Sequence, residues 1–360
     1  MTGFTIATFN LYQWAQPGTY WYRREADSTN DPTKHWEPKR AFLANLLAEA
    51  NADVIGFQEV FSHEDLADFM RDQGYPWFSI VISASRLPQD PDVFAAPTVA
   101  IASRFEIRSV RAVAPRPDIE VEGLLAPDFD YRRDVLAAEI SVPGLAEPMI
   151  VHVCHFKSQG AFVDADAAAA LPEWDQRFRY TLHQRALRTA NQIIRRAGEA
   201  MMLYDHVMAL SHANPKQGVV VMGDLNAPPD SITTRILTQS EQLTDVARRK
   251  VAKLASAEKR HLYSNMLYDT RHLTGQTGAL APTHFYWSGG SVLDYVLVNN
   301  ALNANNKVGH VAYPERAWLI DAHLSPGDRR VKSDHAAVVT HFALRGVGQP
   351  ADQTPDIAAV

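Results

Sequence analysis

The chain of 360 residues is 46% hydrophobic and 21% charged, with a formal net charge of −6 and a single cysteine, Cys154. This composition is typical of a folded protein and excludes a disordered or fibrous chain, while one cysteine excludes an internal disulfide framework. The acidic balance disfavours a protein that grips duplex DNA over many phosphates, although a local basic groove is compatible with it.

No apolar stretch is long enough to cross a bilayer, and Met1–Phe9 lacks the basic start and hydrophobic run of a secretory signal. The sequence therefore predicts a soluble, cytoplasmic protein with no membrane span, and secretion after loss of a signal peptide stays open. No internal repeat or linker divides the chain. We expect a single domain over residues 1–345 and a flexible tail over 346–360, which is rich in Gly, Pro and Gln.

The first predicted elements are two strands with a helix between them. Alternating apolar residues over 4–9 predict a strand that ends at Asn10. Apolar residues at helical spacing predict a helix over 38–50, with a proline in its first turn. The apolar run 53–57 predicts a buried strand that ends at Glu59. Each strand therefore delivers a polar side chain to the edge of a sheet.

The next predicted element is a helix that begins after Ser62, because Asp65 follows three positions later in the manner of a capping box and Gly74 marks a stop. Apolar runs predict later strands at 98–102, 135–142, 149–156, 219–222, 291–298 and 336–344. Three segments are interpreted as additions to this frame: 13–36, 113–130 and 160–216. The third has a mostly helical pattern, and we expect it to wall or cover a site.

Polar residues follow the buried run Val219–Met222. Asp224 and Asn226 are two positions apart, so in an extended chain they point the same way and both can reach one ligand from a sheet edge. A simple turn is the alternative, since Asp and Asn followed by Pro228 are ordinary turn formers. On this pattern alone the two interpretations are equally good.

A buried carboxylate is predicted at Asp294, which shares a strand face with apolar neighbours and needs a partner there. His335, directly before the last strand, is the candidate. An Asp bonded to one imidazole nitrogen fixes the tautomer and favours the protonated form, which is useful where negative charge develops. For one such pair, an ordinary core hydrogen bond is the commoner explanation. Glu59 and His155, each at a strand end, also have commoner structural explanations when taken singly.

Repetition changes that balance, because five predicted strands finish in Asn, Glu, His or Asp where the apolar residues stop. Carboxylate and amide oxygens suit a hard ion such as Mg²⁺, Mn²⁺ or Ca²⁺. Zinc held by His152 and His155 is disfavoured, because their odd separation on a strand points them to opposite faces.

Seven motifs in this order resemble those of the endonuclease, exonuclease and phosphatase superfamily, which is related to pancreatic-type deoxyribonuclease and the apurinic endonucleases. The motifs are Thr8–Asn10, Asp53–Glu59, Val99–Phe105, His155–Ser158, Gly223–Asn226, Leu293–Leu297 and Ser333–His335. The resemblance implies an α/β (α+β) fold of the deoxyribonuclease I type: a four-layer sandwich of two packed mixed β-sheets flanked by helices. It also implies a single catalytic domain with its site at one end of the sandwich.

The resemblance further implies how the site residues divide their work. The implied metal ligands are Glu59, as the main ligand, with Asn10 and Asp334, and the implied catalytic residues are His155, Asp224, Asn226, Asp294 and His335. In this scheme Asp224 orients or deprotonates the attacking water, His155 and Asn226 hold phosphate oxygens, and Asp294 pairs with His335. The expected ion is Mg²⁺, with Mn²⁺ or Ca²⁺ as alternatives. Tyr12 stands where some apurinic endonucleases carry Asp, so a second metal position on that side is not implied.

The substrate is the least determined part, because superfamily relatives cut DNA, RNA, sphingomyelin and phosphoinositides with the same core. Aromatic and basic residues follow Asn10 closely: Tyr12, Trp14, Tyr20, Trp21, Tyr22 and Trp36, with Arg23, Arg24, Lys34 and Lys39 between them. They are suited to stacking unpaired bases, or alternatively to pinning a long loop onto the body. Arg133, beside Arg132, and Lys157 are candidates for phosphate contact, as is Tyr12.

The leading prediction is therefore a metal-dependent phosphodiesterase of nuclease type, with a phosphate ester, nucleic acid among the candidates, as its substrate. The alternative is a phosphatase or phosphodiesterase for a small or lipid-derived ester, which the acidic balance favours. A non-catalytic binding protein is a third hypothesis, but it predicts damaged motifs and these motifs are complete. The sequence predicts no oligomeric state.

Overall fold

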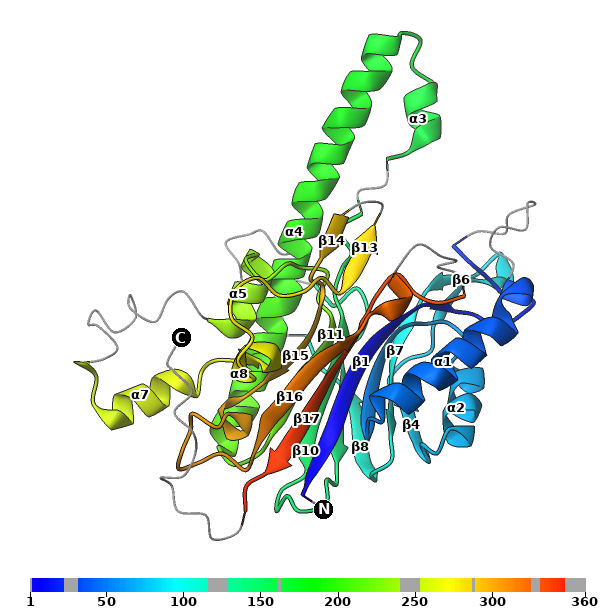
Figure 1. Ribbon diagram of the computed structural model, residues 1–360. Coiled ribbons are helices and arrows are strands. Elements are labelled where there is room, and N and C mark those ends of the chain that lie inside the picture. Colours follow the sequence, from blue (N-terminus) through cyan, green and yellow to red (C-terminus); the bar gives the residue numbers. More distant parts are fainter. Residues whose placement is uncertain are drawn as a thin grey trace.

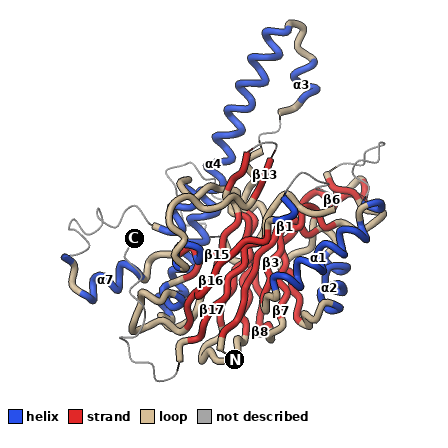
Figure 2. The backbone as a smooth tube through the Cα atoms, viewed as in Figure 1, coloured by secondary structure: helices blue, strands red, loops and turns tan. Residues whose placement is uncertain are grey.

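The computed structural model describes residues 2–22, 32–115, 129–160, 163–239, 253–286, 289–324 and 331–346. Within them two six-stranded sheets pack face to face, and helices cover both outer faces (Figure 1). Figure 2 shows the same layers with strands and helices distinguished by colour. The predicted four-layer α/β sandwich of two mixed sheets is confirmed. Arg23, Arg24 and residues 347–360, which include most of the predicted tail, lie outside the described residues.

The first sheet is built around the N-terminal strand. Its order is β16 (Ala312–Ile320), β17 (Ala337–Leu344), β1 (Gly3–Trp14), β3 (Val54–Val60), β7 (Thr98–Ser103) and β4 (Trp77–Ile80). Strand β1 runs antiparallel to β17 and parallel to β3. Because parallel neighbours end at the same edge, β1 and β3 bring the residues after their apolar runs to one end of the sandwich.

The second sheet repeats this plan. Its order is β12 (Tyr268–Asp269), β15 (Asp294–Val298), β11 (Val219–Asp224), β10 (Met149–His155), β9 (Leu136–Ile140) and β8 (Ile107–Ala112). Strands β10 and β11 are parallel, with His155 opposite Asp224, and β15 runs antiparallel with Asp294 opposite Asp224. The register alone therefore places these three polar side chains next to one another.

Helices and two small sheets complete the described structure. The helices are α1 (Trp36–Ala50), α2 (His63–Asp72), α3 (Ala165–Ala169), α4 (Trp174–Ala213), α5 (Ile232–Thr238), α7 (Ser256–Tyr263) and α8 (Thr270–Leu273), with short 3₁₀ turns at Pro32–Lys34, Asn300–Leu302 and Ala322–Leu324. The small sheets pair β13 (His284–Tyr286) with β14 (Gly289–Ser291), and β6 (Asp90–Ala96) with β2 (Tyr20–Trp21) and β5 (Ser85–Leu87). No helix in the described ranges combines the length and apolarity needed to span a bilayer.

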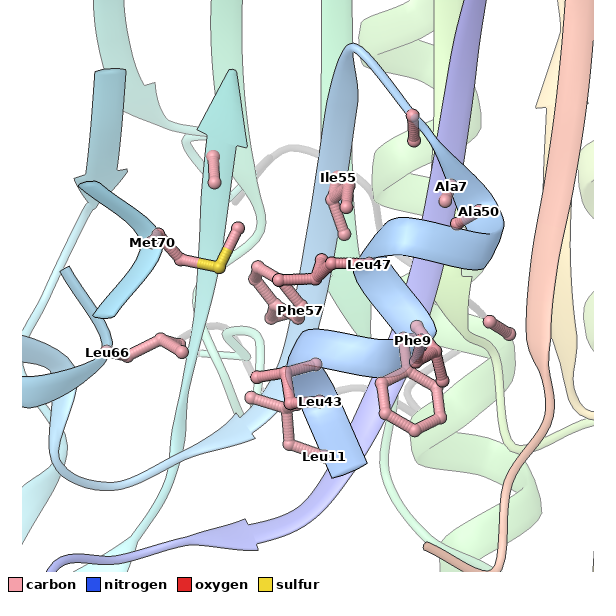
Figure 3. Close-up of a cluster of buried hydrophobic side chains, with 14 of the residues drawn as sticks. Ala7, Phe9, Leu11, Leu43, Leu47, Ala50, Ile55, Phe57, Leu66 and Met70 are labelled. Carbon is pink, nitrogen blue, oxygen red and sulfur yellow. The ribbon is translucent and has the colours of Figure 1, made fainter. Parts of the chain in front are cut away.

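Alternation along the strands divides the core into three apolar layers. Side chains between the sheets include Ile6, Val54, Val153 and Met222, whereas the opposite face of β1 and β3 packs under α1 and α2 through Ala7, Phe9, Ile55, Phe57, Leu43 and Leu47 (Figure 3). The outer face of β11 packs under α4, which contributes Leu203 and Val207. Both faces of each sheet are thus buried, which explains why the strands read as apolar runs.

Two glycines allow close approach near the ends of the strands. A Cβ at Gly56 would lie 2.7 Å from the Cε atom of Met222, so the glycine lets the two sheets meet. Gly223 has a φ of +138°, and a Cβ there would lie 2.0 Å from the carbonyl oxygen of Cys154. Only glycine fits that position, which directly precedes Asp224.

Two local predictions were wrong in detail. Helix α2 does begin after Ser62, but Ser62 does not cap it: its hydroxyl accepts the N–H of Gln16, and Asp65 instead accepts the indole N–H of Trp14. The predicted strand 291–298 is divided between β14 and β15. The division arises because the N–H groups of Leu293 and Asp294 bond to the side chain of Thr283 rather than to a neighbouring strand.

Candidate active site

Asp224 is the centre of a buried polar cluster at the end of the sandwich where β1, β3, β10 and β11 finish. One of its oxygens, Oδ2, accepts a hydrogen bond from Nδ2 of Asn10 at 3.2 Å. The same oxygen lies 3.5 Å from Nε2 of His155 and 3.9 Å from Nε2 of His335. The carboxylate therefore joins the two sheets. Burial raises the pKa of Asp224 to about 7, so it is a far stronger proton acceptor than an exposed aspartate.

The predicted partnership of Asp294 and His335 is present. Nδ1 of His335 lies 2.9 Å from Oδ2 of Asp294, which also accepts the hydroxyl proton of Thr283 at 2.7 Å. Burial by itself lowers the pKa of His335, but the nearby carboxylates of Asp294, Asp224 and Asp334 outweigh it and raise the pKa to about 10. His335 is therefore an imidazolium at neutral pH, held in one orientation by a buried aspartate.

The second histidine of the cluster, His155, differs from His335 in charge. Burial, followed by the positive charge of Arg133, holds the pKa of His155 well below its usual range, so this ring is neutral. The guanidinium of Arg133 donates to the backbone carbonyls of His155 and Phe156 at 3.2 and 3.1 Å. The structure thus brings Arg133 to the site through the backbone of the strand end that carries His155.

Asn226 does not continue an extended chain, so the strand argument for its direction was wrong. Its φ is +50°, and its N–H donates to Oδ1 of Asp224 at 2.8 Å, which makes the segment a turn. Its side-chain amide donates to the carbonyl of Phe156 at 3.1 Å. The turn nevertheless keeps Asn226 beside Asp224, because the turn is closed by that same aspartate.

Glu59 reaches the site only because β3 is irregular. In a regular strand it would share the face of Ile55 and Phe57, which pack under the helices. The register of β3 against β7 shifts between Phe57 and Val60, and Glu59 has a φ of +59°. This bulge turns the carboxylate toward the site, where Asn10, Asp334 and His335 are close enough to affect its pKa. Such a conformation costs about 1–2 kcal/mol for a non-glycine residue, a cost typical of functional positions.

Glu59 and Asp334 form the second acidic part of the cluster. Burial, followed by the charge of Asp334, raises the pKa of Glu59. Oδ1 of Asp334 is buried and has no hydrogen-bond partner among the described residues. Asn10 holds the group together, since its Oδ1 accepts the N–H of Tyr12 while its amide faces Asp224. Adjacent carboxylates with an unsatisfied oxygen fit a divalent cation, which would neutralise them.

Three residues that the sequence did not single out belong to this end of the molecule. Thr283 supports Asp294 as described above, and His284 has Nε2 at 3.5 Å from Oδ2 of Asp334. Glu199 of α4 is buried, and its two oxygens accept the backbone N–H groups of Arg132 and Lys157 at 2.9 and 2.8 Å. The sequence signal that could have indicated Glu199 is its position directly before the buried Ala200 in the helical segment.

The predicted substrate-contact residues lie around this cluster in different ways. The ammonium group of Lys157 donates to the hydroxyl of Ser158, and burial lowers the pKa of Lys157 to about 8. Tyr12 lies with its ring 5.9 Å from the ammonium nitrogen of Lys39. Trp14 and Trp36 are buried against each other in the core, which favours the loop-pinning interpretation for these two. Tyr22 is 53% exposed and close enough to interact electrostatically with Glu59 and Arg133.

The model of the endonuclease/exonuclease/phosphatase family matches residues 8–335, a span that includes every residue of this cluster. The chain belongs to this family. Its members are in general metal-dependent hydrolases of phosphate esters. The sequence-based recognition of the family is therefore confirmed. Among curated proteins, none matches the chain.

Solved structures share the fold at low sequence identity. An endonuclease/exonuclease/phosphatase from Beutenbergia cavernae is 16% identical with a TM-score of 0.54, over 96% of this chain and 72% of that one. The human Nocturnin catalytic domain with bound sulfate is 14% identical with a TM-score of 0.54, over 95% of both chains. A Bacteroides vulgatus family protein is 13% identical with a TM-score of 0.52, over 96% of this chain and all of its own. These likenesses establish the architecture.

Proposed function

We propose that this protein is a divalent-cation-dependent phosphodiesterase of nuclease type. The observation that carries the proposal is the convergence of Glu59, Asp224 and Asp334 with a buried Asp294–His335 pair at one end of the sandwich. Hydrolysis of a phosphodiester needs a cation beside the phosphoryl oxygens, an oriented water molecule and hydrogen-bond donors for the oxygens that gain negative charge. This cluster offers a side chain for each task.

Glu59 and Asp334, with the amide of Asn10, are the residues that would hold the cation. When bound, Mg²⁺ or Mn²⁺ would neutralise the phosphoryl oxygens and stabilise the charge that develops on them. The bulge at Glu59 and the turn at Tyr12 fix the directions of Glu59 and Asn10 before any ligand arrives. Such preorganisation lowers the reorganisation needed at the moment of reaction.

Asp224 would receive the proton of the attacking water. Its Oδ1 accepts the N–H of Asn226, and its Oδ2 accepts the side-chain amide of Asn10 and faces the two imidazole rings. The distances of 3.5 and 3.9 Å from Oδ2 to His155 and His335 exceed those of direct hydrogen bonds. Oδ2 accepts the amide of Asn10 through one lone pair, and its second lone pair would orient a water molecule.

The two histidines would act on the phosphate oxygens. His335 is positively charged and held by Asp294, so Nε2 can donate to an oxygen that becomes negative as the ester bond breaks. Neutral His155 would add an uncharged donor, with Asn226 beside it. Arg133 and Lys157 would supply further positive charge at the rim.

The nuclease preference rests on the rim of the site. Arg133, Lys157 and the exposed Tyr22 combine positive charge with an aromatic ring near the acidic cluster, an arrangement suited to a phosphate chain with unpaired bases. Sulfate bound to the human Nocturnin catalytic domain is consistent with an anion site in this fold. The alternative, a small or lipid-derived phosphate ester, is favoured by the net charge of −6.

The test is a side-by-side assay of plasmid DNA, single-stranded DNA, mononucleotides and phospholipid vesicles with Mg²⁺ or Mn²⁺, repeated with a chelator. We expect cleavage of nucleic acid that stops when the cation is removed. Intact nucleic acid together with hydrolysed small esters or phospholipids would overturn the substrate class. Activity that persists in the chelator would overturn the cation dependence.

A further inference from the structure

His284 lies beside the acidic cluster and has no part in the reaction scheme above. We propose that His284 is a nitrogen ligand of the cation held by Asp334, and that it shifts the preference of this site from Mg²⁺ toward first-row transition metals such as Co²⁺. The inference rests on the proposed cation dependence. It adds a ligand from outside the seven sequence motifs.

The position of His284 is fixed by backbone contacts rather than by a flexible loop. His284 forms an isolated antiparallel bridge with His335. On either side of it, the N–H of Phe285 donates to the carbonyl of Asp334 at 3.1 Å, and the N–H of Ala336 donates to the carbonyl of Thr283 at 2.6 Å. The hairpin β13–β14 is therefore fastened to the segment that carries Asp334.

His284 interacts directly with the Asp334 carboxylate, and the long distance between them also fits two ligands of one ion. Nε2 of His284 lies 3.5 Å from Oδ2 of Asp334, whereas nitrogen–oxygen hydrogen bonds are about 2.7–3.2 Å long. Two atoms that each lie about 2.1 Å from an ion, at a right angle or somewhat more, are about 3.0–3.5 Å apart. One ligand atom each from His284, Asp334 and His335 can be chosen so that all lie within 4.8 Å of one another.

A second observation comes from Asp334 itself. The residue is 9% exposed, and its buried Oδ1 has no hydrogen-bond partner among the described residues. A buried carboxylate oxygen without a partner is costly unless a positive ligand satisfies it. His335 bonds to Asp294 through Nδ1, and its Nε2 lies 3.9 Å from Oδ1 of Asp334, beyond hydrogen-bond range, so His284 is the imidazole available to complete the set.

The chemistry of the donors gives the expected selectivity. Mg²⁺ strongly favours oxygen ligands, and replacing one oxygen by an imidazole nitrogen favours later first-row metals. A site of Glu59, Asp334 and Asn10 alone would offer oxygen atoms only. With His284 the set becomes mixed, so the ratio of Co²⁺ to Mg²⁺ affinity is the quantity that reports its role.

The experiment measures Co²⁺ and Mg²⁺ binding by calorimetry, together with the visible absorption of bound Co²⁺, in the wild type, His284→Gln and the control His341→Gln. His341 bonds to Thr5 on β1, away from the cluster, and the control removes an imidazole in the same way. We expect His284→Gln to weaken Co²⁺ binding about tenfold or more, to change the Co²⁺ spectrum and to leave Mg²⁺ affinity within about twofold. The control should resemble the wild type.

Equal Co²⁺ affinity and an equal spectrum in the wild type and His284→Gln would overturn the inference, as would a parallel loss of both metals. Thermal melting checks that the variant folds, and His284→Asn serves if the glutamine variant does not. If the wild type binds no divalent ion at all, the proposed function fails as well. If cation binding depends on Glu59 but not on His284, only this inference fails.

Discussion

The strand ends of the sandwich and the outer half of α4 lie at the same end of the molecule but are built in opposite ways. At the strand ends the polar side chains are buried and hold one another, as Asp224, 2% exposed, illustrates. Helix α4 extends beyond the sandwich, past the β13–β14 hairpin (Figure 1), and there Trp174 is 73% exposed and stacked on Phe178.

The difference indicates a division of labour. Moving any buried polar group at the strand ends would leave its hydrogen-bond partners unsatisfied. The positions of these side chains are therefore fixed by the bonds between them. The exposed arginines and aromatic residues of α4 carry no comparable constraint and are suited to follow the substrate. The residues at the strand ends would then catalyse the reaction, and added segments such as α4 would select the substrate. Four predictions test this division.

The largest effect is expected at Glu59. Glu59→Gln keeps the size of the side chain but removes the charge proposed to hold the cation, so the turnover of a nitrophenyl phosphodiester should fall by roughly two to four orders of magnitude. Initial rates with Mg²⁺ or Mn²⁺ measure it. Glu139→Gln, on the outlying β9, is the control and should keep wild-type activity. A Glu59→Gln enzyme with near-normal turnover would remove Glu59 from the metal site.

The second effect concerns Glu199, where the two regions join. Glu199→Gln leaves one of the backbone N–H groups of Arg132 or Lys157 without a strong acceptor, which should lower the free energy of unfolding by about 1–3 kcal/mol. Because Arg132 and Lys157 lie at the proposed substrate-binding rim of the site, KM for the phosphodiester should rise about tenfold with a smaller change in kcat. Denaturant titration and steady-state kinetics measure the two parts, with the exposed Glu64→Gln as control. A change in kcat alone would contradict a positioning role.

The third effect is the pH dependence of substrate binding through Lys157. Its pKa is lowered to about 8, mainly by burial, so the ammonium is charged below that pH and neutral above it. KM should therefore rise several-fold between pH 7 and pH 9.5. Lys157→Arg keeps the charge throughout this window and should flatten the profile. An unchanged profile in the arginine variant would show that another group is responsible.

The smallest effect is expected from the tip of α4. Replacing Trp174 and Phe178 by serine removes exposed side chains, so the small nitrophenyl ester should be hydrolysed at an unchanged rate. With single-stranded DNA, KM should rise about fivefold, which corresponds to the lower end of the roughly 1–3 kcal/mol that base stacking on an aromatic ring contributes. Equal effects on both substrates would break the comparison, since the tip would then act on the reaction itself.

The sandwich and its polar strand ends could be predicted because apolar runs and buried carboxylates obey strong constraints. Asp294 required a partner wherever it was buried, and His335 supplied it. The direction of Glu59 could not be predicted, because it depends on a bulge that alternation does not reveal. For Asn226 the sequence left an extended chain and a turn equally good, because both use the same residue types, and the structure shows the turn.

His284 and Glu199 escaped prediction for a different reason. His284 becomes relevant only when the β13–β14 hairpin is fastened beside Asp334, a contact between segments far apart in sequence. Glu199 acts through backbone groups of two distant loops, and backbone partners leave no signature in residue types. The helical pattern after residue 160 correctly predicted α3 and α4. It did not predict that α4 extends beyond the sandwich (Figure 1), because the direction of a helix depends on the tertiary contacts of its faces.

The absence of a Cβ atom at Gly223 helps to set the spacing between His155 and Asp224. The strand ends that present His155 and Asp224 can be neighbours because nothing larger than hydrogen intervenes beside the carbonyl of Cys154. A methyl group at position 223 would clash with that carbonyl and separate the two strand ends. His155 and Asp224 would then be displaced from each other without any change in their own chemistry. Inactivity in such an alanine variant would thus be a failure of alignment, and added metal would not restore it.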